Sequence, residues 1–418
     1  MRFIGMDVHR DFCEVAISED GQVRSAGRIV TSVEQLALFA QSLGPADVVV
    51  LEATGGAGRI VDELGRGPAR VLVANTRRLP AAGRAKTDKL DARMLARLAA
   101  SGLLETVWTP DEQTRALRRI CARRDSLVRA RTRAKNETQA VLARNLCARP
   151  PVTDLFGKGG RRWLGGQVLP ADEQLTVDGC LRQIDFLDGE VAAMDHALAA
   201  RALRSPEILR LLSVPGVALN TAACFMAAAR DIRRFSSARK LVGYLGLDPR
   251  VRQSGSREAR HGRISKEGSA LARAMLGEAA WSVAKAPGPL RAFFERIRAR
   301  KGPQVAATAT ARKLACLLWC LLTRGEDYAY ARPSMTRHKI RQLELACGAP
   351  SCKGQQGVAG NRSVTLRETE REVARQAEAA YRRAVADWKS GGPAKMGAGA
   401  TPGRASQGPS RGKAARQT

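Results

Sequence analysis

Four carboxylates lie where acidic residues cost stability unless chemistry uses them. Asp7 interrupts the apolar segment FIGMDV, and Glu52 ends the apolar run VVVLE. Asp88 and Asp91 are three residues apart at the start of a predicted helix, so both face the same side. Carboxylates from two strand ends and one helix turn can bind two Mg²⁺ ions, as phosphoryl-transfer enzymes require. These residues are therefore candidate metal ligands and catalytic groups.

Each carboxylate taken alone also has an ordinary structural interpretation. Asp88 fits a helix N-cap or a first-turn acid, and Asp91 fits a surface ion-pair partner of a neighbouring basic residue. Glu52 fits a surface residue at a strand end. Asp7 is the hardest to explain in this way, and the joint occurrence of all four is more specific than any one of them.

A second cluster lies in the basic segment 247–269, LDPRVRQSGSREARHGRISKEGS, which we expect to be a loop. A serine beside glycine and among arginines is suited to attack a phosphodiester, because guanidinium groups bind the non-bridging oxygens. The alternative is a loop that only binds phosphate, in which Ser254, Ser256 and Ser265 form local hydrogen bonds. The residues alone leave both interpretations open.

The overall charge points to a polyanionic partner. The chain has 418 residues, with 70 Lys+Arg against 40 Asp+Glu and a formal net charge of +30. A surplus of this size favours nucleic acid as the partner, with an acidic membrane surface as the alternative. The longest apolar run, Leu314–Leu322, is too short to span a membrane, and an aspartate at position 7 excludes a signal-peptide core. We expect a cytoplasmic protein without a membrane segment.

Cysteine and histidine give little sign of a metal site. The nine cysteines include no CxxC pair, which argues against both a disulfide scaffold and a zinc site. The chain has only four histidines. The sequence therefore predicts that any metal is held by carboxylates.

The hydrophobic patterns predict four regions. Residues 1–105 alternate strands and helices after three early strands, which indicates an α/β domain with a mixed sheet. Residues 106–204 carry two helices with apolar residues every seven positions, typical of an antiparallel coiled-coil arm or a dimerisation stalk. Residues 205–332 read as a mainly helical domain. Residues 333–418 read as a basic, low-complexity tail that contains one helix between Val364 and Trp388, and we expect about the last thirty residues to be disordered.

Basic residues concentrate on the first long helix and on the serine-containing segment. Because phosphate contacts dominate binding to nucleic acids, we expect these residues to bind the backbone of DNA or RNA. The candidates are Arg118, Arg119, Arg123, Arg129, Arg131, Arg133, Arg250, Arg252, Arg257, Arg260, Arg263 and Lys266.

The motifs in order resemble those of a known family. They read GMDVH, LEATGG, AGRAKTDKLDA, SVPGVALNTAA, DIRRFSSARKLVGYLGLDPRVRQSG and HGRISKEGS. Together they resemble the DEDD transposases of insertion-sequence family 110, including its 1111 branch. The resemblance extends from residue 1 to about residue 330 and leaves out the C-terminal tail.

The resemblance implies a RuvC-like, RNase H-type N-terminal domain whose carboxylates Asp7, Glu52, Asp88 and Asp91 bind Mg²⁺. It also implies a coiled-coil linker and a C-terminal transposase domain with a catalytic serine, placed at Ser254 in the QSG motif. In this family the serine forms a covalent link to DNA, and a bridge RNA pairs with donor and target DNA. Its members assemble as homodimers and homotetramers, with active sites built from two chains.

The resulting prediction is a transposase, a DNA recombinase that cuts and rejoins DNA through Ser254, with Ser256 and Ser265 as alternative nucleophiles. Two other functions stay open. One is a RuvC-like structure-selective endonuclease in which water attacks DNA. The other is a non-catalytic nucleic-acid-binding protein, against which the complete set of four carboxylates argues.

Overall fold

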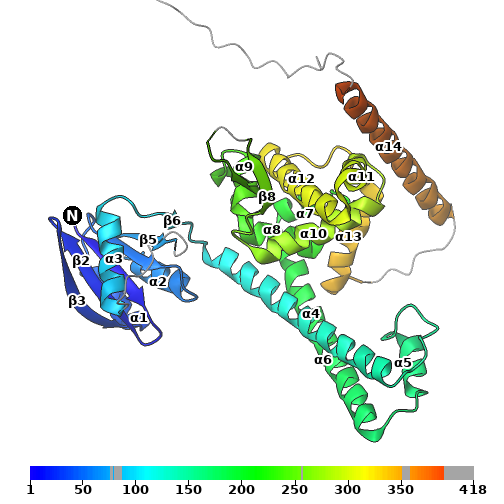
Figure 1. Ribbon diagram of the computed structural model, residues 1–418, viewed down its shortest axis with the longest axis horizontal. Coiled ribbons are helices and arrows are strands. Elements are labelled where there is room, and N and C mark those ends of the chain that lie inside the picture. The colour runs from blue at the N-terminus through cyan, green and yellow to red at the C-terminus, as the bar shows by residue number, and fades with distance from the viewer. Residues whose placement is uncertain (76–78, 80–86, 256–257, 351–357, 390–418) are drawn as a thin grey trace, which may run out of the picture.

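The computed structural model describes residues 1–75, 79, 87–255, 258–350 and 358–389. An α/β domain at the N-terminus leads into a pair of long helices, which project from a mainly helical C-terminal domain (Figure 1). The expected combination of an α/β domain with a mixed sheet and a helical domain is thus confirmed.

The N-terminal sheet has six strands in the described part of the chain, in the order β3-β2-β1-β4-β5-β6. Strands β1, β4 and β5 run parallel, while β2 and β3 form antiparallel pairs beside β1, and β6 is antiparallel to β5. The strands are β1 (Phe3–Val8), β2 (Phe12–Glu19), β3 (Gln22–Val30), β4 (Val48–Glu52), β5 (Arg70–Ala74) and β6 (Thr106–Val107).

Helices cover both faces of this sheet. On one face, Ile4 and Met6 of β1 pack in a core with residues of α1 (Val33–Gln41) and α2 (Ala57–Leu64). On the other face, Val50 of β4 packs with Leu95 of α3 (Asp88–Ala100). Successive residues of a strand face opposite sides, so the odd-numbered residues of β1 lie on the α3 side.

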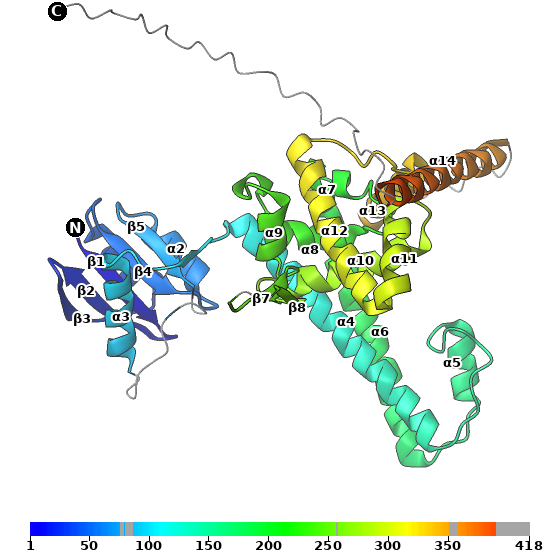
Figure 2. The same ribbon diagram turned by 45° about the horizontal axis from the view of Figure 1, so that its top comes forward.

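The two long helices are α4 (Glu112–Arg144) and α6 (Ala171–Ala202), joined by a segment that contains α5 (Lys158–Gly165). They lie side by side in both views (Figures 1 and 2). All four apolar residues of the seven-residue repeat in α6 are buried. They are Val177, Ile184, Val191 and Leu198.

Ion pairs between these helices fix their direction. Arg124 pairs with Asp195, and Arg131, one repeat further along α4, pairs with Asp188. Because the residue number rises on α4 while it falls on α6, the helices are antiparallel.

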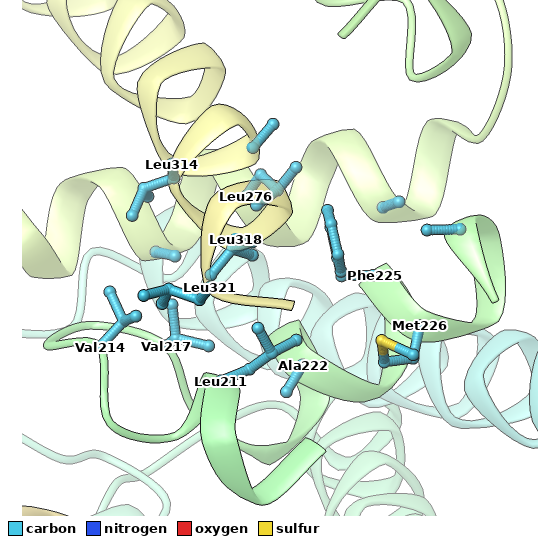
Figure 3. Close-up of a cluster of buried hydrophobic side chains, with 14 of the residues drawn as sticks. Leu211, Val214, Val217, Ala222, Phe225, Met226, Leu276, Leu314, Leu318 and Leu321 are labelled. Carbon is cyan, nitrogen blue, oxygen red and sulfur yellow. The ribbon is translucent and has the colours of Figure 1, made fainter. Parts of the chain in front are cut away.

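The C-terminal domain encloses a large apolar core. Phe225, Leu276, Leu314 and Leu318 come from three different helices and meet there (Figure 3). The elements of this domain are α7 (Pro206–Leu211), α8 (Leu219–Ala229), η2 (Ile232–Arg234), α9 (Ala238–Tyr244), β7 (Pro249–Arg252), β8 (Arg260–Ile264), α10 (Ala270–Lys285), α11 (Pro289–Lys301) and α12 (Pro303–Arg324).

Helix α12 explains the longest apolar run of the sequence. Among the helices in the described part of the chain, it alone has the length and apolar composition to cross a membrane. Its leucines Leu314, Leu318 and Leu321 are buried in the core of the C-terminal domain. Its apolar character is therefore accounted for by packing inside the protein.

The prediction of a low-complexity tail from residue 333 is wrong for its first segment. Residues Pro333–Ala346 form α13 and Val358–Lys389 form α14, while residues 390–418 lie outside the described part. The ammonium of Lys339 donates hydrogen bonds to three backbone carbonyls of the turn between α7 and α8, at 2.7–3.0 Å. The helix expected between Val364 and Trp388 is confirmed.

The packing of α13 and α14 against the rest of the protein could not be predicted from their composition. Each presents few apolar side chains, so their sequences read as solvated. Contacts between polar groups replace a broad apolar face: the buried carboxylate of Glu378 on α14 accepts hydrogen bonds from the backbone N–H of Gly288 and from Arg291. Such contacts depend on partners far away in the sequence.

Candidate carboxylate site and serine hairpin

Asp7 and Glu52 lie at the same edge of the sheet. Strands β1 and β4 are parallel, and Met6 is paired in register with Leu51. The next residue on each strand is therefore an acid, on the face that α3 covers. The two sequence-predicted carboxylates of the sheet are thus brought together, as parallel pairing requires.

Glycine at position 5 lets α3 approach this edge. A Cβ atom on Gly5 would lie 2.1 Å from the carbonyl oxygen of Ala92 and 2.6 Å from the backbone nitrogen of Ala96. The backbone of α3 therefore lies directly against β1. Gly5 and Asp7 share a face of the strand, so the same contact places the beginning of α3 over Asp7.

The first turn of α3 carries the other two acids. Thr87 is the N-cap, and its side chain accepts a hydrogen bond from the backbone N–H of Leu90. Asp88 and Asp91 are both in the first turn, where the helix dipole favours negative charge. Asp88 is thus the first helical residue and not the cap, which removes one of its ordinary structural interpretations.

The electrostatics of Asp7 show how closely these acids gather. Its side chain is only 12% exposed, and burial raises its pKa above the usual range. His9 acts in the opposite direction, while the negative charges of Asp88 and Asp91 raise the pKa further. A carboxylate in such surroundings is stabilised when a cation binds beside it.

His9 joins the site, and the sequence analysis missed it. Its Nε2 atom lies 3.1 Å from Oδ2 of Asp7 and 3.4 Å from Oδ2 of Asp88. These three side chains form the group with metal-ligand spacing in the described part of the chain. The structure therefore adds an imidazole to the side chains that surround the predicted carboxylate site. His9 lies just after β1, so its position two residues after Asp7 carries no clear signal until the turn between β1 and β2 is known.

The donor set fits a divalent metal ion. Carboxylate oxygens are hard ligands suited to Mg²⁺ or Mn²⁺. Asp7 of β1 and Asp88 of α3 gather here with His9, and Asp91 is near enough to act on the charge of Asp7. Burial of Asp7 beside two further acids leaves a local excess of negative charge. A cation at this place would offset that excess.

The serine segment is a β-hairpin where the sequence predicted a loop. Strands β7 and β8 pair antiparallel, with Val251 opposite His261. At the base of the hairpin, Gly246 has φ +67° and lies so close to Glu267 that a Cβ atom would be 1.9 Å from its carbonyl oxygen. Only glycine fits there, so the base of the hairpin is tightly held.

The three candidate serines differ in their surroundings. Ser254 follows β7 near the hairpin tip and is exposed, and its hydroxyl has no hydrogen-bond partner among the described residues. Ser265 instead donates a hydrogen bond from its hydroxyl to Oδ1 of Asp248, at 2.6 Å. Ser256 lies outside the described residues. The geometry therefore leaves Ser254 accessible and gives Ser265 a structural role.

The basic side chains of the hairpin have no acidic partners among the described residues. Within the described residues, the side chains of the hairpin's basic residues are exposed and form no ion pair with a carboxylate. They are Arg250, Arg252, Arg260, Arg263 and Lys266. Arg257 lies outside the described residues. Unpaired guanidinium groups around an exposed serine form a surface that attracts phosphate.

Most candidate arginines on α4 are already engaged. Arg118 donates to backbone carbonyls at the end of α8, and Arg131 pairs with Asp188 of α6. Arg119, Arg123 and Arg129 also form ion pairs with acids on α4 or α6. Arg133 has no carboxylate partner among the described residues. The arm is therefore less positive than its arginine content indicates.

Two family models match the chain over the regions just described. Residues 4–145 match a model described as a transposase of the DEDD type, and residues 209–295 match the model of the transposase IS116/IS110/IS902 family. The first match contains all four carboxylates, and the second contains the serine hairpin.

Curated relatives extend the similarity over most of the chain. The transposase for insertion sequence element IS1111A of Coxiella burnetii is 26% identical over 78% of this chain and 91% of its own length. The putative transposase y4qE of Sinorhizobium fredii is 27% identical over 76% of this chain and 88% of its own length. A probable family 20 transposase of Pseudomonas aeruginosa is 28% identical over 58% of this chain and 74% of its own length.

The fold, the carboxylate site and these similarities define a transposase, an enzyme that acts on DNA. The chain belongs to the IS110 family of DEDD transposases.

Proposed function

We propose that this transposase cuts and rejoins DNA through a covalent link to Ser254. The proposal rests on one observation above all: Ser254 is exposed, lacks a hydrogen-bond partner among the described residues, and lies among cations that have no acidic partner. The arginines would bind the non-bridging oxygens of the scissile phosphate, which draws the serine oxygen to the phosphorus. As the serine oxygen forms its bond to phosphorus, the bond from phosphorus to a deoxyribose oxygen breaks. That oxygen leaves as a hydroxyl group, and the serine proton passes to solvent, so one proton is released for each one taken up.

The carboxylates Asp7, Glu52, Asp88 and Asp91 would hold Mg²⁺ at the edge of the N-terminal sheet. When bound, the metal supplies positive charge that neutralises phosphate oxygens. The role of the protein is to fix the acids: β1 and β4 set two of them, and the contact at Gly5 sets the other two. The buried position of Asp7 excludes much of the water that would screen this charge.

The order and directions of β3, β2, β1, β4 and β5 fit the RuvC-like, RNase H-type fold that the family resemblance implies. The antiparallel pair α4 and α6, with its seven-residue repeat, fits the implied coiled-coil arm. The hairpin strands β7 and β8 belong to a different domain from the sheet that carries Asp7 and Glu52 (Figure 2). We therefore propose that an active site combines Ser254 and the carboxylates from two chains, in a homodimer or homotetramer.

The same family resemblance supports guidance by a bridge RNA, and action in the bacterial cytoplasm on chromosomal DNA. The hairpin cations Arg250, Arg252, Arg260, Arg263 and Lys266 would contact phosphate, which carries no sequence information. Base pairing with a guide would supply the specificity that such contacts lack.

The test is a search for a protein–DNA adduct. The protein is incubated with Mg²⁺, its co-purifying RNA and DNA that spans the element end, and the products are separated on a denaturing gel. We expect an adduct that Ser254→Ala abolishes. Ser265→Ala is the matched control, since this serine lies in the same hairpin region but is bonded to Asp248; the adduct should persist wherever the hairpin still folds.

Other outcomes would assign a different chemistry. Nicks with free 5′-phosphates and full activity of Ser254→Ala would replace the proposal with a nuclease that uses water. Salt-dependent binding without any strand cleavage would indicate a non-catalytic nucleic-acid-binding protein. Asp88→Asn distinguishes the metal site from the hairpin, because it should abolish cleavage and leave DNA binding near normal.

A further inference from the structure

His9 lies in the carboxylate site at the spacing of a metal ligand. In an octahedral site with bonds of about 2.0–2.1 Å, neighbouring ligand atoms are about 2.8–3.0 Å apart. The Nε2 atom of His9 lies 3.1 Å from a carboxylate oxygen of Asp7 and 3.4 Å from one of Asp88. Both separations are close to those of adjacent ligands around one ion.

Neighbouring contacts hold the imidazole in this position. Its ring packs against that of Phe12, with centroids 4.9 Å apart, and the backbone N–H of His9 donates to the carbonyl of Phe12 at 2.9 Å. The hydroxyl of Thr31 donates to the carbonyl of His9 at 3.2 Å. The turn between β1 and β2 is therefore fixed on both sides, and the ring is oriented before any metal binds.

We infer that His9 is a direct ligand of the divalent ion at this site and shifts the preference of the site from Mg²⁺ toward a first-row transition ion such as Mn²⁺. Imidazole nitrogen is a softer donor than carboxylate oxygen, and Mg²⁺ favours oxygen ligands and water. Mn²⁺ accepts the same octahedral geometry and tolerates nitrogen. The inference rests on the proposed metal site and specifies which ion that site takes.

An ordinary interpretation of His9 makes a different prediction. The ring could serve only as an ion-pair partner that spans two acids, at the 3.1 and 3.4 Å separations already given. In that case a metal would displace the ring or bind without it. Replacement of His9 would then leave the ratio of Mn²⁺ to Mg²⁺ affinity unchanged.

The experiment measures metal binding to the full chain. Mn²⁺ and Mg²⁺ affinities are determined by calorimetry, with and without DNA, for the wild type and for His9→Ala. Pulsed EPR of bound Mn²⁺ reports whether a nitrogen is coordinated. We expect a nitrogen coupling in the wild type, its loss in His9→Ala, at least a tenfold loss of Mn²⁺ affinity, and a change of Mg²⁺ affinity below about threefold.

His196→Ala is the matched control, because His196 is an exposed histidine bonded through Nδ1 to the carbonyl of Ala346, away from the site. It should change neither spectrum nor affinity. Bound Mn²⁺ without nitrogen coupling, together with an unchanged affinity ratio in His9→Ala, would overturn the inference and leave the carboxylate site standing. Absence of Mn²⁺ binding in the wild type, or full binding in Asp88→Asn, would overturn the proposed metal site itself.

Discussion

The contact between α3 and β1 at Gly5 predicts a large cost for a single methyl group. In Gly5→Ala the new Cβ would lie 2.1 Å from the carbonyl oxygen of Ala92 and 2.6 Å from the nitrogen of Ala96. Both are backbone atoms of a helix, so no side-chain rotation relieves the overlap. Overpacking of a core costs about 1–3 kcal/mol, and this site belongs at the upper end, about 3 kcal/mol. For a domain of about 100 residues, that lowers Tm by about 12–24 °C.

Scanning calorimetry of the full chain measures the loss, and hydrogen exchange of β1 and α3 peptides locates it. Gly55→Ala is the matched control, because a Cβ atom there meets nothing within 4 Å and its φ is not in the left-handed region. The control should be neutral or slightly stabilising. If Gly5→Ala proved as stable as Gly55→Ala, the close approach of α3, and with it the placement of Asp88 over Asp7, would be refuted.

Two further predictions concern buried charge. Asp7→Asn should raise the stability of the metal-free protein by about 1 kcal/mol, because a buried carboxylate beside two other acids is lost; a lower Tm in EDTA would contradict this. Burial lowers the pKa of Lys339 to about 8, below its usual 10.5. Between pH 8 and pH 10.5 the unfolded chain therefore binds more protons than the folded protein, so the free energy of unfolding should rise with pH in this range. Lys339→Met should lack this rise, whereas parallel pH–stability curves for the two proteins would show that Lys339 does not titrate there.

The N-terminal site was largely predictable because its signals are local. An acid that interrupts an apolar strand and two acids three residues apart on a helix start can be read without knowledge of the fold. Parallel pairing then places Asp7 and Glu52 at one sheet edge, as observed. His9 escaped because a histidine two residues after an acid has no meaning until the turn between β1 and β2 fixes its ring.

The helix α13, the packing of α14 and the hairpin were not predicted for another physical reason. Their polar contacts depend on partners far away in the sequence. Lys339 and Glu378 stabilise their helices through backbone groups more than 80 residues away, at the α7–α8 turn and at Gly288. A residue-by-residue reading treats such side chains as solvated. The hairpin strands β7 and β8 were read as a loop for a similar reason, since their exposed residues show no apolar alternation.

The net charge predicted nucleic acid as the partner, but the number of arginines alone did not show which of them are free to bind it. Arginines on α4 and in the serine segment look alike in the sequence, yet α6 presents acids to α4, as in the pair of Arg131 with Asp188. Among the described residues, the basic side chains of the hairpin form no ion pair with an acid, so their charge stays available to phosphate. Because an ion pair must be broken before its arginine can bind a phosphate, unpaired cations contribute more to affinity than paired ones. We therefore expect the binding surface to lie where arginines have no acidic partner among the described residues, as they do around Ser254.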